Sequence, residues 1–157
     1  MNINNKETER KFLIKKLPEN LENCEKYHII QAYISRNPTM RLRKRNEEYI
    51  FTFKGAGFIE RTEFEYPLTR EQFEGLMKKT EGNVIEKYRY IVPLENDLIA
   101  EVDIYKGDLE GFMNVEVEFK SLAEAADFKI PEWFGSEVSL DRRYSNASLS
   151  LYGLPRD

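Results

Sequence analysis

Cysteine and histidine are scarce in this chain of 157 residues, which has one of each, Cys24 and His28. A single cysteine excludes an internal disulfide and is typical of a reducing compartment. A single histidine excludes a metal site built from several histidines and argues against a histidine-based catalytic triad. Any chemistry must therefore come from other side chains.

Long apolar runs and an excess of basic charge are also missing. No stretch approaches the roughly 18 consecutive apolar residues of a membrane span, and Met1 leads into polar residues rather than an apolar signal segment. We therefore expect a cytoplasmic protein without a membrane partner. The 24 basic residues are outnumbered by 28 acidic ones, for a net charge of −4, so we expect no nucleic-acid partner.

The size and composition are typical of one globular domain. Hydrophobic residues make up 41% of the chain and charged residues 33%, which is enough apolar material for a core. No linker, repeat or low-complexity segment divides the sequence. We therefore expect a single domain over residues 1–157.

Alternation with a period of two is the dominant pattern and predicts β-strands. Turn signals separate the runs, among them Asn46-Glu47-Glu48 and Gly55-Ala56-Gly57. The predicted strands lie at about 6–14, 27–36, 40–46, 48–54, 59–67, 84–92, 97–105 and 112–119.

Helical patterns are fewer. Two capping boxes, in which Thr or Ser is followed three residues later by Gln or Glu, predict helices over 69–79 and 121–127. The tail over 139–152 has the pattern of a helix with a break, placed on the surface or across one end of the sheet. Eight strands with short connections predict an α+β, mainly β fold: an eight-stranded antiparallel closed barrel with peripheral helices.

One face of nearly every predicted strand is charged, and the sign of the charge segregates by strand. An ordinary sheet with one wet face would mix uncharged polar residues among the charges, and like charges two residues apart repel each other. The acidic pairs are Glu7/Glu9, Glu63/Glu65, Glu101/Asp103 and Glu116/Glu118, and the basic sets are Arg41/Arg43/Arg45 and Lys87/Arg89.

A ligand between the two sets would relieve this repulsion. Carboxylates suit hard divalent cations, and guanidinium and ammonium groups suit phosphate oxygens. The pattern therefore favours a ligand with several phosphates plus a metal ion, enclosed by the sheet. The two-faced sheet with its charges in water is the alternative on pattern alone.

The charged strands contain a series of short motifs. They are ExExK at Glu7, Glu9 and Lys11, RLR at Arg41 and Arg43, TxK at Thr52 and Lys54, RxExE at Arg61, Glu63 and Glu65, KxR at Lys87 and Arg89, the strand of Asp103, and ExE at Glu116 and Glu118. These motifs, in this order, resemble those of the CYTH superfamily, the triphosphate tunnel metalloenzymes, and in particular its short bacterial members. The tail PEWFGSEVSLDRRYSNASL also looks like the C-terminal segment of those members.

The resemblance implies a triphosphate-binding tunnel that uses Mg²⁺ or Mn²⁺, and it implies roles by position. The residues expected to bind phosphate are Lys11, Arg41, Arg43, Lys54, Arg61, Lys87 and Arg89. Those expected to bind metal are Glu7, Glu9, Asp103, Glu116 and Glu118. The candidate catalytic residues are Glu63 and Glu65, for a second metal or the attacking water, and Lys11 with Tyr33 as a dyad.

The expected function is metal-dependent hydrolysis of a bound triphosphate. Inorganic tripolyphosphate, split to pyrophosphate and phosphate, is favoured over nucleoside triphosphates. A class IV adenylyl cyclase and a non-catalytic polyphosphate-binding module stay open as alternatives. The placement of Arg45, near a turn, and a homodimer paired through exposed apolar strand faces are also open.

Overall fold

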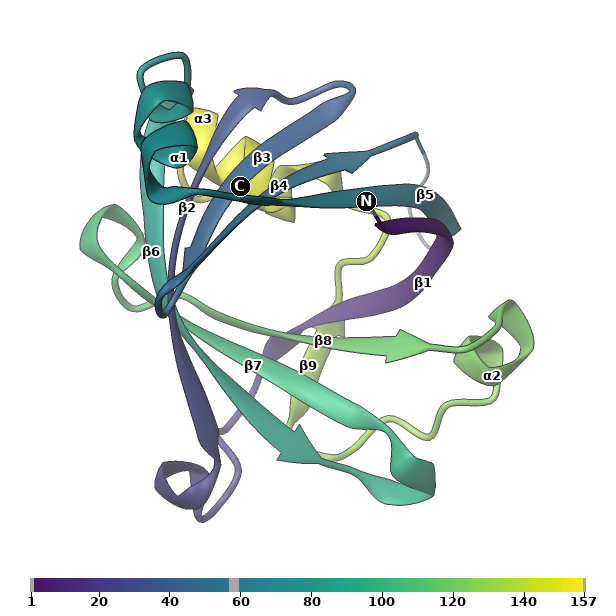
Figure 1. Cartoon of the computed structure of the whole chain (residues 1–157). Coiled ribbons are helices and arrows are strands. Elements are labelled where there is room, and N and C mark those ends of the chain that lie inside the picture. Colours follow the sequence, from purple (N-terminus) through teal and green to yellow (C-terminus); the bar gives the residue numbers. More distant parts are fainter. Residues whose placement is uncertain (1, 57–59, 157) are drawn as a thin grey trace.

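The computed structural model describes residues 2–56 and 60–156, and the side chains of the first strand from Thr8 onward. Nine strands, three α-helices and four 3₁₀ helices form among these residues (Figure 1). The strands are β1 Asn2–Ile14, β2 Glu25–Ser35, β3 Thr39–Arg45, β4 Glu48–Lys54, β5 Glu60–Leu68, β6 Glu81–Pro93, β7 Ile99–Lys106, β8 Met113–Phe119 and β9 Phe134–Glu137. The helices are α1 Arg70–Met77, α2 Leu122–Ala126 and α3 Asn146–Tyr152, with 3₁₀ turns at Leu21–Asn23, Glu95–Asp97, Gly107–Leu109 and Arg142–Tyr144.

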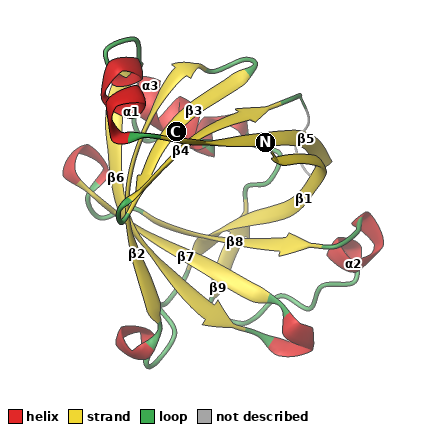
Figure 2. Cartoon of the chain, viewed as in Figure 1, coloured by secondary structure: helices red, strands yellow, loops and turns green. Residues whose placement is uncertain are grey.

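Eight of the strands close into an antiparallel barrel, which confirms the predicted fold. Its order is β5-β4-β3-β2-β6-β7-β8-β1, and pairing of β1 with β5 completes the ring. Strands dominate the molecule and the helices lie at its periphery (Figure 2). The predicted strands all form, with β1 and β6 beginning a few residues earlier than the sequence pattern indicates.

Strand β1 changes its partner along its length. Its first half pairs with β5 as far as Thr8, and its last residues pair with β9, while β8 follows its other edge. Between these pairings the tail continues the ladder, because Val138 N–H donates to the Lys11 carbonyl and Lys11 N–H donates to Ser139 Oγ. The sequence pattern did not predict β9, since four residues are too few to display an alternation.

The barrel turns its charged face inward and its apolar face outward. Glu9 and Lys11 point into the barrel, whereas Phe12 on the other face of β1 is fully buried beneath the tail. There it packs against Phe134, with the ring centroids 4.9 Å apart, and against Val115 and Val117 of β8. A major part of the apolar core therefore lies outside the barrel wall, under the C-terminal segment and α2.

The helices follow their predicted caps. Thr69 and Gln72 form the capping box of α1, and Ser121 accepts a hydrogen bond from Glu124 N–H at the start of α2. In the tail, the predicted break falls at Ser145, between a 3₁₀ turn and α3. Within residues 2–56 and 60–156, no helix has the length and apolar character needed to cross a membrane.

Two sequence expectations fall partly beyond the described chain. The Gly55-Ala56-Gly57 connection and the start of the predicted strand at residue 59 extend into residues 57–59, which lie outside the described residues.

Phe134 gives a direct test of the external core. Replacing it with alanine removes a ring that is 2% exposed and contacts Phe12, so Phe134→Ala should lower the free energy of unfolding by about 3–5 kcal/mol. Urea denaturation measures the loss. Leu140→Ala, at a tail residue that is 69% exposed, should change stability by less than about 0.5 kcal/mol; similar losses in both variants would contradict this account of the core.

Candidate active site

The inner face of the barrel surrounds a cavity of about 990 Å³, the size of a small-molecule site. Nearly all the side chains predicted for the site line it. They are Glu9, Lys11, Tyr33, Arg41, Arg43, Lys54, Arg61, Glu63, Glu65, Lys87, Arg89, Glu116 and Glu118. Arg45, whose placement the sequence left open, also lines the cavity. It forms an ion pair with Glu48, with Nη2 and Oε2 3.5 Å apart.

Of the two predicted site residues that remain, Glu7 is described only by its backbone. It pairs with Arg61 in the ladder between β1 and β5, and its side chain lies outside the described part of the structure. The prediction that Glu7 binds metal therefore stays a prediction.

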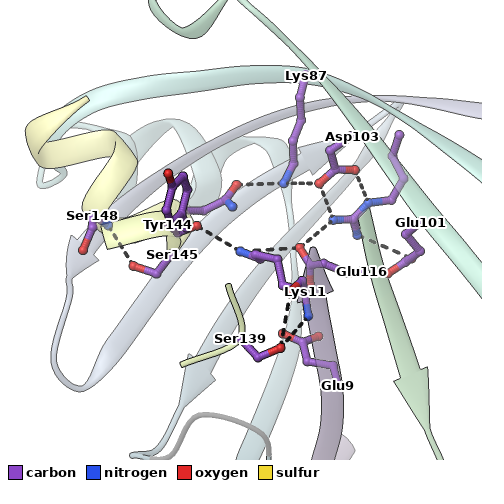
Figure 3. A network of polar contacts seen from close by, with 12 residues as sticks. Glu9, Lys11, Lys87, Glu101, Asp103, Glu116, Ser139, Tyr144, Ser145 and Ser148 are labelled. Carbon is purple, nitrogen blue, oxygen red and sulfur yellow. Dashed lines mark hydrogen bonds and ion pairs between the residues drawn. The ribbon is translucent and has the colours of Figure 1, made fainter. Parts of the chain in front are cut away.

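Asp103 is fully buried behind the cavity surface and joins two cations. Its Oδ2 lies 2.8 Å from Lys87 Nζ, and its two oxygens accept hydrogen bonds of 2.8 and 2.9 Å from the guanidinium of Arg89 (Figure 3). Both oxygens are thus already engaged by positive charge. This environment differs from that expected of a metal ligand and favours a role in positioning Lys87 and Arg89.

The charges of this cluster determine its protonation. Burial alone would raise the pKa of Asp103, but the charges of Arg89 and Lys87 outweigh it and hold that pKa below its ordinary value of 3.8. Burial lowers the pKa of Lys87 to about 7, an effect that Asp103 opposes and that Arg89 and Arg43 reinforce. Asp103 is therefore ionised at neutral pH, and Lys87 is poised to gain charge when an anion approaches.

The basic wall of the cavity is crowded with positive charge. Burial first, and then the charges of Arg41 and Arg89, lower the pKa of Arg43 to about 9. Among the described residues, Arg41 Nε and Arg61 Nε are buried without a hydrogen-bond partner. Unpaired buried donors are costly, so the wall is suited to an anion whose oxygens can accept from several of these groups.

The acidic wall brings like charges face to face. Glu9 lies directly opposite Glu118 in the ladder between β1 and β8, and Glu101 lies opposite Glu116 between β7 and β8. Such pairs repel unless a cation intervenes. Part of the compensation comes from the basic side, since Glu9 is 3.6 Å from Arg61 Nη2 and Glu116 is 3.8 Å from Lys11 Nζ.

The carboxylates present fit a divalent cation that also binds substrate. No group of three acidic, histidine or cysteine side chains close enough to hold a metal alone occurs among the described residues. Mg²⁺ usually takes one or two carboxylates and completes its octahedron with water and phosphate oxygens. The facing pair Glu9 and Glu118 matches that need without a protein cage.

The two residues of the predicted dyad, Lys11 and Tyr33, line the same cavity and make their hydrogen bonds to other groups. Lys11 Nζ donates to the Tyr144 carbonyl at 3.1 Å, and the hydroxyl of Tyr33 accepts from Gln31 Nε2 at 3.2 Å. Within the described residues no hydrogen bond joins Lys11 to Tyr33. A catalytic pairing of the two stays a prediction.

The tail contributes cavity residues that the motifs did not identify. Tyr144 and Asn146 line the cavity together with Arg142 and Arg143, so the start of the last helix borders the cavity, while Tyr152 at its end is 71% exposed. Asn146 is the first residue of α3 and touches Lys87. Neither Tyr144 nor Asn146 belongs to a charged motif, although the prediction of a tail across one end of the sheet pointed to this region.

The fold and the site together define a class of protein. It is a closed antiparallel barrel with cationic side chains on one side of its interior and carboxylates on the other, an arrangement suited to binding a polyanion and a metal ion. A family model described as the CYTH domain matches residues 5–145. The chain belongs to the CYTH domain family, as the order of its motifs predicts.

Two proteins named inorganic triphosphatase are among its relatives. The one from Nitrosomonas europaea is 40% identical over 149 residues, covering 92% of this chain and 97% of that protein. The one from Acetivibrio thermocellus is 35% identical over 147 residues, covering 92% of each. The crystal structure of the inorganic triphosphatase NE1496 superimposes with a TM-score of 0.70 at 36% identity, covering 95% of this chain and 97% of that one.

Asp103→Asn tests the buried cluster. The substitution removes the carboxylate that Lys87 and Arg89 share and leaves Arg89 only the longer ion pairs with Glu101 and Glu116, so it should lower the free energy of unfolding at pH 7 by about 3–5 kcal/mol. Because the pKa of Asp103 is lowered on folding, its stabilisation is present above about pH 3.8 and disappears as the pH falls through the lower folded value. Urea denaturation from pH 7 to pH 3 should show the two proteins converging.

Asp108→Asn is the matched control, since Asp108 is exposed and the same change there should alter stability by less than about 0.5 kcal/mol. A gap between wild type and Asp103→Asn that stayed constant down to pH 3 would contradict the lowered pKa of Asp103.

Proposed function

We propose that this chain is a metal-dependent triphosphatase that hydrolyses inorganic tripolyphosphate to pyrophosphate and phosphate. The observation that carries the proposal is the cavity with a cationic wall on β3 and β6 and facing carboxylates on β1 and β8. Relatives at 40% and 35% identity that bear the name inorganic triphosphatase support the same reaction.

In this proposal the basic wall binds the phosphate chain. Arg41 and Arg43 lie side by side on β3, with Lys87 and Arg89 on β6 at the far edge of β2. Phosphate oxygens would accept a hydrogen bond from the buried Arg41 Nε and offset the burial and the neighbouring positive charges that lower the pKa of Arg43. Lys54 and Arg61 would hold the remaining part of the chain from β4 and β5.

Glu9 and Glu118 would hold the metal, with Glu7 and Glu116 as further ligands, and we propose Mg²⁺ or Mn²⁺ because all of these ligands are carboxylate oxygens. Bound there, the ion would neutralise charge on the phosphoryl oxygens and polarise the bond that breaks.

The remaining cavity residues would serve the attack of water. Glu63 and Glu65 line the cavity from β5, where a carboxylate can orient a water molecule in line with the leaving oxygen. Lys11 projects from β1 between Glu116 and the Tyr144 carbonyl. From there its ammonium would neutralise charge on a departing phosphate, with Tyr33 as its proposed partner.

We also propose that residues 1–157 act as one CYTH-like domain, because the tail lines the same cavity as the barrel. A small triphosphate is the proposed partner, and a homodimer is a further proposal for the exposed apolar strand faces. The scarcity of cysteine supports a cytoplasmic location.

Phosphate release tests the reaction. With Mg²⁺ or Mn²⁺, the wild type should release phosphate from tripolyphosphate faster than from ATP or thiamine triphosphate. Glu9→Gln should lower kcat/KM by at least 100-fold, since it removes a carboxylate from the proposed metal site. Glu74→Gln, the same change on the outer helix α1 with Glu74 58% exposed, should leave the rate unchanged. Cyclic AMP formed from ATP without phosphate release would instead identify an adenylyl cyclase.

Ligand binding should also stabilise the fold. Tripolyphosphate relieves the repulsion among the buried cations, so it should raise the melting temperature, and adding Mg²⁺ or Mn²⁺ should raise it further by stabilising the carboxylate wall. Thermal melts with each ligand alone and with both test this. Stabilisation without any turnover would indicate a polyphosphate-binding module, and melts unaffected by both ligands would contradict the assigned site.

A further inference from the structure

Asn146 connects three strands of the barrel from the first turn of α3. Its Oδ1 accepts hydrogen bonds from Gln31 Nε2 at 2.6 Å and from Lys87 Nζ at 2.8 Å, and its Nδ2 donates to the hydroxyl of Tyr105 at 3.0 Å. These partners lie on β2, β6 and β7 respectively. One amide thus links the tail to the basic wall of the cavity.

Arg43 determines the direction of the hydrogen bonds that run through Gln31 to Asn146. Arg43 Nε can only donate, and it donates to Gln31 Oε1 at 2.9 Å. Gln31 must then present its NH₂ group to Asn146, which must present its oxygen. Protonated Lys87, the form that a bound anion favours because burial lowers its pKa to about 7, donates to that same oxygen. The two amides therefore have one consistent orientation, running from Arg43 to Lys87.

This network leaves defined donors for a phosphate. An ammonium has three N–H groups in tetrahedral directions, and Asp103 and Asn146 accept two of those of Lys87. Because Asp103 and Asn146 fix two of these N–H groups, they also fix the direction of the third N–H group of Lys87. On Arg43, Gln31 engages Nε, which leaves the terminal nitrogens of the guanidinium for a phosphate oxygen pair.

We propose that Asn146 is a positioning residue that orients Lys87 directly, and Arg43 through Gln31, for substrate binding. The inference rests on the proposed function, since it assigns the cations of that same site to a triphosphate. Without the amide oxygen, Lys87 retains Asp103 and the face of the Tyr105 ring 5.3 Å away, and its ammonium can turn toward the carboxylate and away from the substrate.

Ser150, on the same helix, provides a control for the effect of weakening the contact between α3 and the barrel. Ser150 is buried at the opposite end of α3 and donates a hydrogen bond from Oγ to the carbonyl of Asn83 on β6. It does not line the cavity. Asn146→Ala and Ser150→Ala therefore each remove one side-chain link between α3 and β6, and only the first removes a contact to a proposed phosphate ligand.

The test is steady-state hydrolysis of tripolyphosphate with Mg²⁺, together with thermal melts, for wild type and both variants. We expect Asn146→Ala to raise KM about tenfold with a smaller effect on kcat, since it disorders ground-state contacts to the substrate. Ser150→Ala should also lower the melting temperature, by less because it removes one hydrogen bond rather than three, and should leave KM unchanged. Equal increases of KM in both variants would show that Asn146 acts only by holding α3 in place.

A double-mutant cycle with Lys87→Gln identifies the route. If Asn146 acts through Lys87, Asn146→Ala should raise KM much less in the Lys87→Gln background than in the wild type. Additive effects would overturn the direct route through Lys87.

Equilibrium binding of tripolyphosphate to the same variants, without metal, separates this inference from the proposed function. A wild type that binds tripolyphosphate in this experiment but does not cleave it in the hydrolysis assay with Mg²⁺ would refute the proposed reaction. The affinities of the variants would then still decide the role of Asn146. A wild type that neither binds nor cleaves it would overturn both.

Discussion

The separation of opposite charges across the interior of a closed barrel is the constraint on which this structure depends. Turning Arg, Lys and Glu side chains inward removes them from bulk water, which is costly unless each is compensated. Asp103 supplies the central compensation, because its two oxygens engage Lys87 and Arg89 at once. The apolar core is correspondingly displaced to the outside of the wall, where Phe12 and Phe134 pack.

Because the charged side chains face the interior and the apolar core lies outside the wall, the same contacts determine the binding site and the stability of the fold. Each cation in the wall is held by a neighbour on an adjacent strand, so the ladder register also determines the geometry of the site. Arg89 lies opposite Asp103, and Tyr33 lies opposite Arg41, as a result of strand pairing. A rigid sheet is a precise support for such side chains, since a register shift by one residue would exchange its two faces.

Much of the interior could be predicted from the sequence because a strand has a strict period of two. Once Lys87 and Arg89 are assigned to one face, Tyr88 must lie on the other, and the cavity lining follows. The ion pairs of Asp103 with Lys87 and Arg89 could not be predicted, because they depend on which residues face it across the sheet. Asn146 was equally hidden: a single amide in a short tail shows no alternation, and its partners are distant in sequence.

The change of partner along β1 has a consequence for how the protein is made. The edge that β5 leaves uncovered is completed by Val138 and Ser139, which contact Lys11 across almost the whole chain. Contacts of such high sequence separation form late and slow folding. During synthesis the first strand therefore emerges early, yet its edge stays open until β9, Val138 and Ser139 have emerged from the ribosome. A chain truncated before β9 would present an unpaired strand edge, the template for aggregation.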